Sequence, residues 1–130
     1  MRYAVSGTRS RLSDLDKVLI NHTLGFHGVD ETNFIHVGDC KSGVDEFIRK
    51  HPQLTIGGVY EADWDTHGKA AGPIRNRTML ASEPSVAFAF PRLGLPNKGT
   101  KDFVRACLER EVDVLVTWLL EDSRADGGWL

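Results

Sequence analysis

The sequence predicts an α/β fold, a single domain with a mostly parallel five-stranded sheet and helices on both faces. Segments with strand-like and helix-like patterns alternate along the chain, as they do in parallel sheets. The run Val86 to Phe90 is continuously apolar, which is typical of a strand buried on both faces. The 130 residues are enough for about one domain.

The first half of the chain is predicted to contain three strands and two helices. Tyr3 to Val5 is a short apolar run that ends in a polar turn, and apolar residues at 12, 15, 18 and 19 follow at helical spacing. A serine at 10 or 13 is available as N-cap, and glycines 25 and 28 mark the end of this helix. The second strand is 34–37, the second helix runs through 44–48 and stops before proline 52, and the third strand is 54–60.

The second half is predicted to continue the alternation. A helix covers 70–81, with Pro73 suited to its first turn. The strand 86–90 ends at Pro91, a Gly/Pro-bearing loop covers 92–98, a helix runs through 103–108 and the last strand covers 112–116. We expect one domain over residues 1–121 and a C-terminal tail over 122–130.

Composition excludes several classes of protein. The net charge of −2 lacks the basic excess of a general nucleic-acid binder, so a nucleic-acid partner is not expected. The longest apolar runs are too short for a membrane span, and the first residues lack the pattern of a signal peptide. The two cysteines, Cys40 and Cys107, are expected to be free thiols, and the protein is expected to be cytoplasmic. We expect reducing agents to leave its stability unchanged.

Polar segments follow the first four predicted strands. They are residues 6–9, 38–45, 63–69 and 91–100. Ligands of open parallel sheets bind outside the carboxyl ends of the strands, so these segments are expected to converge on one cleft. The alternative is that they are plain connectors.

The first two segments contain groups that suit an anion. Ser6, Gly7, Thr8 and Arg9 offer a close backbone approach, hydroxyls and a guanidinium, although such a tetrapeptide is also a common tight turn. The second segment has backbone amides before a helix start, and it contributes the candidate residues Gly38, Asp39, Cys40, Ser42, Gly43 and Asp45.

Single residues of the second segment allow more than one interpretation. Asp45 would orient a ribose hydroxyl, act as a general base, or simply favour the first helical turn. Cys40 is a nucleophile near a helix N-terminus or a small packed thiol. A branched residue at Gly43 is expected to disrupt binding more than folding.

The third segment and the helix after it add an aromatic and several charges. Trp64 and Lys69 would clamp a base or sugar, while His67 and its neighbouring aspartates match no standard metal-ligand spacing, so no metal is expected. Arg75 is predicted in the first turn of its helix, where the helix dipole disfavours a cation. Its partner would be an anionic ligand, with Asn76 beside it.

Arg75 has a second predicted partner. A salt bridge to Glu61, Asp63 or Asp65 would also offset the dipole.

In order along the chain, these segments resemble the SLOG superfamily, specifically its small YspA/cpYpsA-like branch. The matching pieces include Val5 to Arg9, Gly38 to Asp45, Ala62 to Trp64, Gly68 to Asn76, and Ala89 to Pro91 followed by Gly99 and Thr100. The resemblance covers residues 5 to about 105. It implies a Rossmann-like sheet whose cleft binds nucleotides or nucleotide-derived molecules. Related proteins include the LOG enzymes, which cleave the N-glycosidic bond of nucleoside monophosphates, and the DNA-processing DprA proteins.

The sequence departs from the LOG pattern at one position. The catalytic arginine of those enzymes aligns with Arg75, but their glutamate aligns with Phe103, and only Asp102 lies nearby. Cleavage of a glycosidic bond needs a carboxylate that stabilises ribose charge or transfers protons. The resemblance therefore implies Arg75 and Asp102 as catalytic residues only if the chain is an enzyme.

The sequence therefore predicts a protein that binds a nucleotide, an ADP-ribose-like molecule, a cyclic nucleotide or a nucleoside phosphate, as a sensor or a sequestering protein. The alternative is a phosphoribohydrolase, an N-glycosidase that acts on nucleoside 5′-monophosphates. The chain is expected to form a homo-oligomer, a dimer or higher, and no cofactor is expected.

Overall fold

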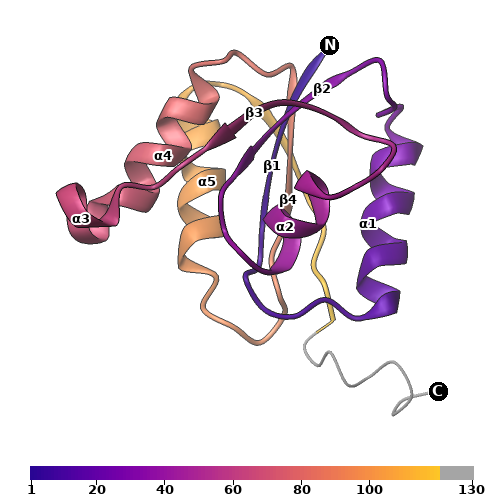
Figure 1. Ribbon diagram of the computed structural model, residues 1–130, viewed down its shortest axis with the longest axis horizontal. Coiled ribbons are helices and arrows are strands. Elements are labelled where there is room, and N and C mark those ends of the chain that lie inside the picture. The colour runs from indigo at the N-terminus through magenta and orange to yellow at the C-terminus, as the bar shows by residue number, and fades with distance from the viewer. Residues whose placement is uncertain (121–130) are drawn as a thin grey trace.

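Five parallel strands form one sheet in the order β3-β2-β1-β4-β5 in the computed structural model, which describes residues 1–120 (Figure 1). The strands are β1 (Arg2–Gly7), β2 (Phe34–Gly38), β3 (Thr55–Tyr60), β4 (Val86–Phe90) and β5 (Asp113–Val116). All four strand pairings are parallel, which confirms the predicted fold class. The predicted tail, 122–130, lies outside the described residues.

Helices cover both faces of the sheet. One face carries α1 (Asp14–Phe26) and α2 (Gly43–Arg49), and the other carries α4 (Ala71–Leu80) and α5 (Lys98–Glu109) (Figure 1). The short helix α3 (Trp64–His67) and a 3₁₀ turn (Gly68–Ala70) protrude at the side of the molecule. None of the helices of residues 1–120 is long and apolar enough to cross a membrane.

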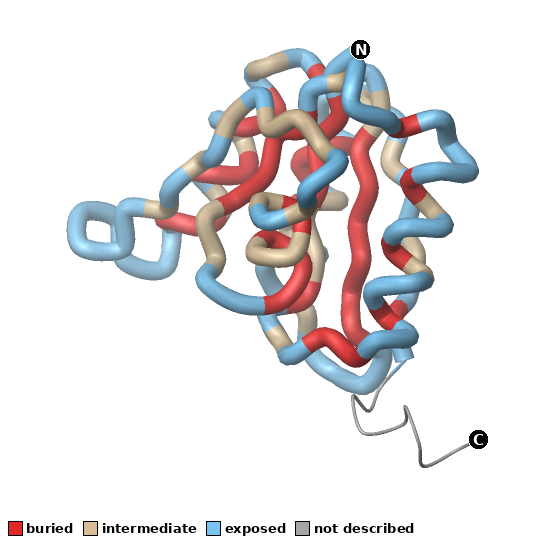
Figure 2. Tube along the Cα trace, turned by 45° about the vertical axis from the view of Figure 1, so that its right-hand side comes forward, coloured by how far each residue is buried: buried red, intermediate tan, exposed pale blue. Residues whose placement is uncertain are grey.

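The two faces of the sheet differ in the size of their side chains. Successive strand residues point to opposite faces, so Val5 packs toward α1 and α2 while Ala4 packs toward α4 and α5. Alanines of β4, Ala87 and Ala89, join Ala4 beneath the second pair of helices. The central strands β1, β2 and β4 are buried over much of their length (Figure 2).

The start of α1 agrees with the sequence, and its apolar face agrees in part. Ser13 is the N-cap: its hydroxyl accepts from the Asp16 amide at 3.0 Å, and Asp16 accepts from the Ser13 amide at 2.9 Å. Leu19 packs against the core, and Leu12 is buried there although it precedes the helix. Leu15 and Val18 are exposed, and Ile20 and Leu24 face the sheet in their place.

The second half of the chain departs from expectation in two places. Residues 64–70 form helical turns where only a polar connector was predicted. Helix α5 begins at Lys98, so Gly99 and Thr100 lie in its first turn and not in a loop. The helix predicted over 70–81 is present as α4.

A buried ion pair joins the end of the sheet to α1. Arg92 follows β4, is 2% exposed, and donates from Nη2 to Oδ2 of Asp16 at 2.8 Å. The same guanidinium donates to the Ser10 hydroxyl and to the carbonyls of Arg11 and Leu120. These bonds hold the residues after β1 against the end of the described chain.

Candidate functional site

A cleft of about 590 Å³ lies at the carboxyl end of the sheet, formed by the segments after β1, β2 and β3 and by the starts of α4 and α5. The sequence-predicted residues that line it are Ser6, Gly7, Thr8, Arg9, Cys40, Asp45, Trp64, Lys69, Arg75, Gly99, Thr100 and Asp102. Five other predicted residues lie outside the lining, namely Gly38, Asp39, Ser42, Gly43 and Asn76. Their predicted contact with a ligand therefore lacks support from this geometry.

The turn after β1 is built by close packing. The Thr8 amide donates to the Phe90 carbonyl at 2.9 Å, and the hydroxyls of Thr8 and Ser10 lie 2.8 Å apart. A Cβ on Gly7 would lie 2.5 Å from a methyl of Val44. Glycine at this position therefore lets α2 approach the end of β1, besides lining the cleft.

The segment before α2 binds protein carbonyls where the sequence predicted an anion. The Val44 amide donates to the Thr8 carbonyl at 3.0 Å, and the Ser42 hydroxyl donates to the Arg9 carbonyl at 2.7 Å. Gly43 has a φ of +72°, and a Cβ there would lie 2.1 Å from the Thr8 oxygen. Gly43 is thus a packing glycine that holds this segment against the turn after β1.

Asp45 is a buried acid at the cleft. It is 4% exposed, and its Oδ2 accepts from the Cys40 amide at 3.3 Å. Burial raises the pKa of this carboxyl above its ordinary value, against the lowering effects of the Arg75 charge and of hydrogen bonds from Cys40. Burial of Cys40 itself, together with the Asp45 charge, raises the pKa of its thiol, which disfavours the thiolate form that a nucleophile needs.

Arg75 is paired within the protein, and its predicted position and partners are both corrected. It is the fifth residue of α4 and so lies beyond the first turn, where the helix dipole has little effect. It is 6% exposed, and Nη1 donates to Oδ1 of Asp39 at 3.1 Å, while Nε donates to Oδ1 of Asn76 at 3.1 Å. None of the three carboxylates predicted as salt-bridge partners, at 61, 63 and 65, pairs with it.

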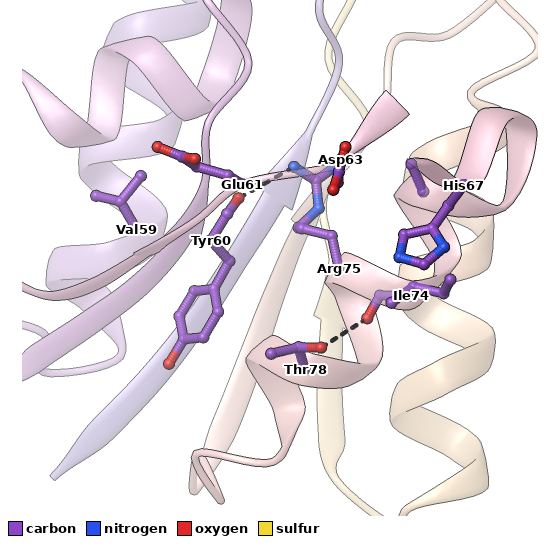
Figure 3. Close-up of a pocket in the computed structure, with 9 residues that line it drawn as sticks. Val59, Tyr60, Glu61, Asp63, His67, Ile74, Arg75 and Thr78 are labelled. Atoms are coloured by element: carbon purple, nitrogen blue, oxygen red, sulfur yellow. Dashed lines mark hydrogen bonds between the residues drawn. The ribbon is translucent and has the colours of Figure 1, made fainter. Parts of the chain in front are cut away.

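Arg75 also borders a smaller cavity on its other side. This cavity of about 410 Å³ lies between the end of β3 and α4, and Arg75 reaches toward the Tyr60 carbonyl there at 3.5 Å (Figure 3). Asp63 and His67 also line this cavity (Figure 3). The guanidinium is therefore part of the wall that divides this cavity from the cleft.

The resemblance to the LOG enzymes singled out Asp102 and Phe103, and both are held by the protein. Asp102 accepts from Nη1 of Arg77 at 3.0 Å and from the side-chain amide of Asn76 at 3.0 Å. The side chain of Phe103 is fully buried in the core between the sheet and the helices α4 and α5. Among residues 1–120, no free carboxylate therefore lies at the start of α5.

The N-terminus of α5 faces the cleft without a side-chain cap. Its N-cap, Asn97, has a left-handed φ of 52° and uses its side chain for the backbone of Arg92 and Leu95. Thr100 in the first turn is 4% exposed, and its hydroxyl has no hydrogen-bond partner within residues 1–120. A Cβ on Gly99 would meet no atom within 4 Å. Free amides, an unpaired hydroxyl and open space thus meet at one point.

Cationic side chains and an aromatic ring line the same cleft as the start of α5. Arg9 lies over the indole of Trp64, with Cζ 5.4 Å from the ring centroid, and Trp64 is 47% exposed. Neither Arg9, Lys69 nor Lys98 forms an ion pair within the part of the chain that the structure describes. The cleft therefore offers an excess of unpaired positive charge beside an exposed aromatic face.

The cleft lining also includes residues that were not among the predicted site residues, namely Ser10, Gly72, Pro73, Leu95, Pro96, Asn97 and Lys98. Of these, residues 95–98 belong to the polar segment 91–100, which was expected to reach the cleft. Across residues 1–120, no three His, Cys, Asp or Glu side chains are grouped so as to hold a metal ion. No protein-family model, no curated protein and no solved structure matches this chain.

Proposed function

We propose that this protein binds a nucleotide or a nucleotide-derived phosphate ester in the cleft at the carboxyl end of its sheet, as a sensor or a sequestering protein. The observation that carries the proposal is the uncapped N-terminus of α5, where the buried Thr100 hydroxyl has no partner among residues 1–120. A buried hydroxyl without a hydrogen bond costs stability, and a bound anion would remove that cost. The resemblance to the SLOG superfamily supports the same ligand class.

The phosphate is assigned to the space between the first turn of α5 and the turn after β1. There it would accept from the first-turn amides of α5 and from Thr100, and it would lie among the unpaired cations Arg9, Lys69 and Lys98. This assignment replaces the segment 38–43, in which the Ser42 hydroxyl donates to the Arg9 carbonyl and the Cys40 amide donates to Asp45.

The aromatic side of the cleft is assigned to a base. A flat heterocycle stacks on an exposed indole, and Trp64 is half exposed at the cleft with Arg9 beside it. The two features together, an anion site and an aromatic face in one cavity, fit a nucleotide better than a free phosphate or a peptide.

Binding is favoured over N-glycosidase activity because Asp102 is bound by Arg77 and Asn76. A catalytic carboxylate has to reach the ribose or the leaving base, and that reach would require breaking both contacts. Incubation with the four nucleoside 5′-monophosphates, followed by chromatography for free base, separates the two functions. Release of base would replace the binding proposal with the enzymatic one.

The site is tested by a matched pair of glycine variants. Gly99→Val would place a branched side chain in the cleft, and Gly25→Val would place the same side chain in open space on α1. Both glycines lie in helices, and a Cβ at either position would meet no atom within 4 Å, so both variants are expected to fold. Calorimetric titration with nucleoside monophosphates and ADP-ribose is expected to show binding to wild type and Gly25→Val, and at least about 10-fold weaker binding to Gly99→Val.

The outcomes of that titration are distinct. Absence of binding by every compound in wild type would reject the proposed ligand class. Equal binding by both glycine variants would place the ligand away from α5.

The expected homo-oligomer and cytoplasmic location belong to the same proposal. Exposed apolar side chains at the β5 edge, Leu115, Val116 and Trp118, support association between copies of the chain. Light scattering after size-exclusion chromatography is expected to give at least twice the mass of 14.4 kDa. A measured mass equal to that of a single chain would reject the proposed homo-oligomer.

A further inference from the structure

One buried acid of the cleft has an unused oxygen. Asp45 is 4% exposed, lines the cleft, and accepts from the Cys40 amide through Oδ2. Apart from Cys40, no residue of 1–120 donates a hydrogen bond to Asp45, and Asp45 forms no ion pair in that part of the chain, so no donor other than Cys40 reaches Oδ1. A buried carboxylate oxygen without a donor is costly, so the cleft is built for a ligand that brings one.

The other acids near the cleft are already engaged. Asp39 follows β2, the strand end where dinucleotide-binding folds carry an acid for the ribose, but here it pairs with Arg75. Asp102 is held by Arg77 and Asn76. Asp39 also lies outside the cleft lining. Of the three, Asp45 alone is buried, lines the cleft and forms no ion pair within residues 1–120.

The surroundings of Asp45 select the kind of donor. The cleft already contains unpaired cations at Arg9, Lys69 and Lys98, so a cationic ligand group is disfavoured there. A neutral O–H group can donate to the carboxylate of Asp45, and an anionic group on the same molecule can interact with the unpaired cations. The base of the nucleotide is assigned to the half-exposed Trp64, and its phosphate is assigned to the start of α5. The sugar is then the remaining part of the ligand that can reach the buried Asp45.

We propose that Oδ1 of Asp45 accepts a hydrogen bond from a ribose hydroxyl of the bound nucleotide, so that this residue makes the cleft selective for ribose over deoxyribose. This inference rests on the proposed nucleotide binding. It narrows the ligand class to ribonucleotides and their derivatives with free hydroxyls. Asp45 is the specificity-determining residue of the cleft.

The experiment compares ligands that differ by one hydroxyl. The four ribonucleoside 5′-monophosphates and their 2′-deoxy and 3′-deoxy forms are titrated into wild type, Asp45→Ala and Glu46→Gln. Glu46 is the neighbouring acid on α2, is outside the cleft lining and forms only a surface pair with Lys50, so it is the matched control. Wild type and Glu46→Gln are expected to prefer the ribonucleotide over one deoxy form by at least about 10-fold, as for a hydrogen bond to a charged group. Asp45→Ala is expected to bind both forms alike.

Each other outcome has a definite meaning. Equal binding of ribo and deoxy forms by wild type, or a preference that survives in Asp45→Ala, would overturn the assignment of the hydroxyl to Asp45. An equal loss for both forms in Asp45→Ala would also overturn it, because the donor would then lie on the base. Failure of every nucleotide to bind wild type would instead reject the proposed function. If Asp45→Ala does not fold, Asp45→Asn, which keeps the size of the side chain, takes its place and is expected to reduce the preference.

Discussion

Nη1 of Arg75 lies 3.1 Å from Oδ1 of Asp39 and joins the middle of α4 to the end of β2. Nε of the same guanidinium satisfies the buried amide oxygen of Asn76 at 3.1 Å. Arg75 thus connects two strand–helix units of the fold at the wall of the cleft, and its charge is already compensated without a ligand.

Arg75→Ala is therefore expected to reduce the free energy of unfolding by about 1–3 kcal/mol, because the buried Asn76 oxygen loses its donor. Urea unfolding of the ligand-free variant measures this loss. Exposed Arg105→Ala is the control and should leave stability nearly unchanged. Wild-type stability together with a lost affinity for nucleotides would show that Arg75 serves the ligand and not the fold.

Removing one partner of the ion pair between Arg92 and Asp16 is expected to have a larger effect. Both side chains are 2% exposed, so Arg92→Met leaves a buried carboxylate without its cation and should cost about 3–5 kcal/mol of unfolding free energy. Thermal and urea unfolding measure the loss. The double variant Arg92→Met with Asp16→Leu removes the orphaned charge and should recover part of it, and no recovery would contradict this account.

Gly43→Val is expected to damage folding, contrary to the expectation from the sequence. The φ of +72° is strained for a branched residue, and a Cβ would lie 2.1 Å from the Thr8 oxygen. The expected loss of stability is at least about 2 kcal/mol. Gly25→Val, which meets no atom within 4 Å, is the control in the same melting experiment. A melting temperature like that of wild type would restore the binding role of Gly43.

Asp45→Asn is expected to stabilise the ligand-free protein near neutral pH. Burial raises the pKa of Asp45 in the folded state, so the folded state holds this proton more tightly than the unfolded state does. Stability is therefore lost as the pH rises from about 4 through the raised pKa. Asparagine carries no such charge.

The advantage of Asp45→Asn in melting temperature should accordingly grow as the pH rises from about 4 through the raised pKa of Asp45. Glu46→Gln on the same helix is the control and should follow wild type. An advantage that is independent of pH would show that burial of the charge is not the cause.

The two thiols are expected to be unreactive in the folded protein. Cys40 and Cys107 are free, and burial raises the pKa of Cys107 to about 12. Ellman's reagent at mildly alkaline pH should leave Cys107 unmodified until the protein unfolds, with Cys107→Ala as the control that identifies the slow thiol. Dithiothreitol should leave the melting temperature unchanged. A lowered melting temperature would reveal a disulfide in solution.

The sequence by itself determined the parallel α/β class, because strand-like runs such as Val86 to Phe90 alternate with amphipathic segments and both signals are local. It also located the cleft, since the carboxyl ends of parallel strands must share one edge of the sheet. The same local reasoning predicted the span of α4 and narrowed the N-cap of α1 to Ser10 or Ser13, of which the structure uses Ser13.

Only the tertiary structure decided which polar groups are free. Arg75 and Asp39 are 36 residues apart in sequence, and the Ser42 hydroxyl finds the Arg9 carbonyl across 33 residues. Motifs that look alike as sequence therefore differ in availability. The Ser42 hydroxyl and the Cys40 amide are bound by the protein, whereas the Thr100 hydroxyl has no partner in residues 1–120 and Asp45 has none there besides Cys40. Hydrogen bonds between distant segments leave no trace in local spacing, because they depend on strand order and on the packing of helices across the sheet.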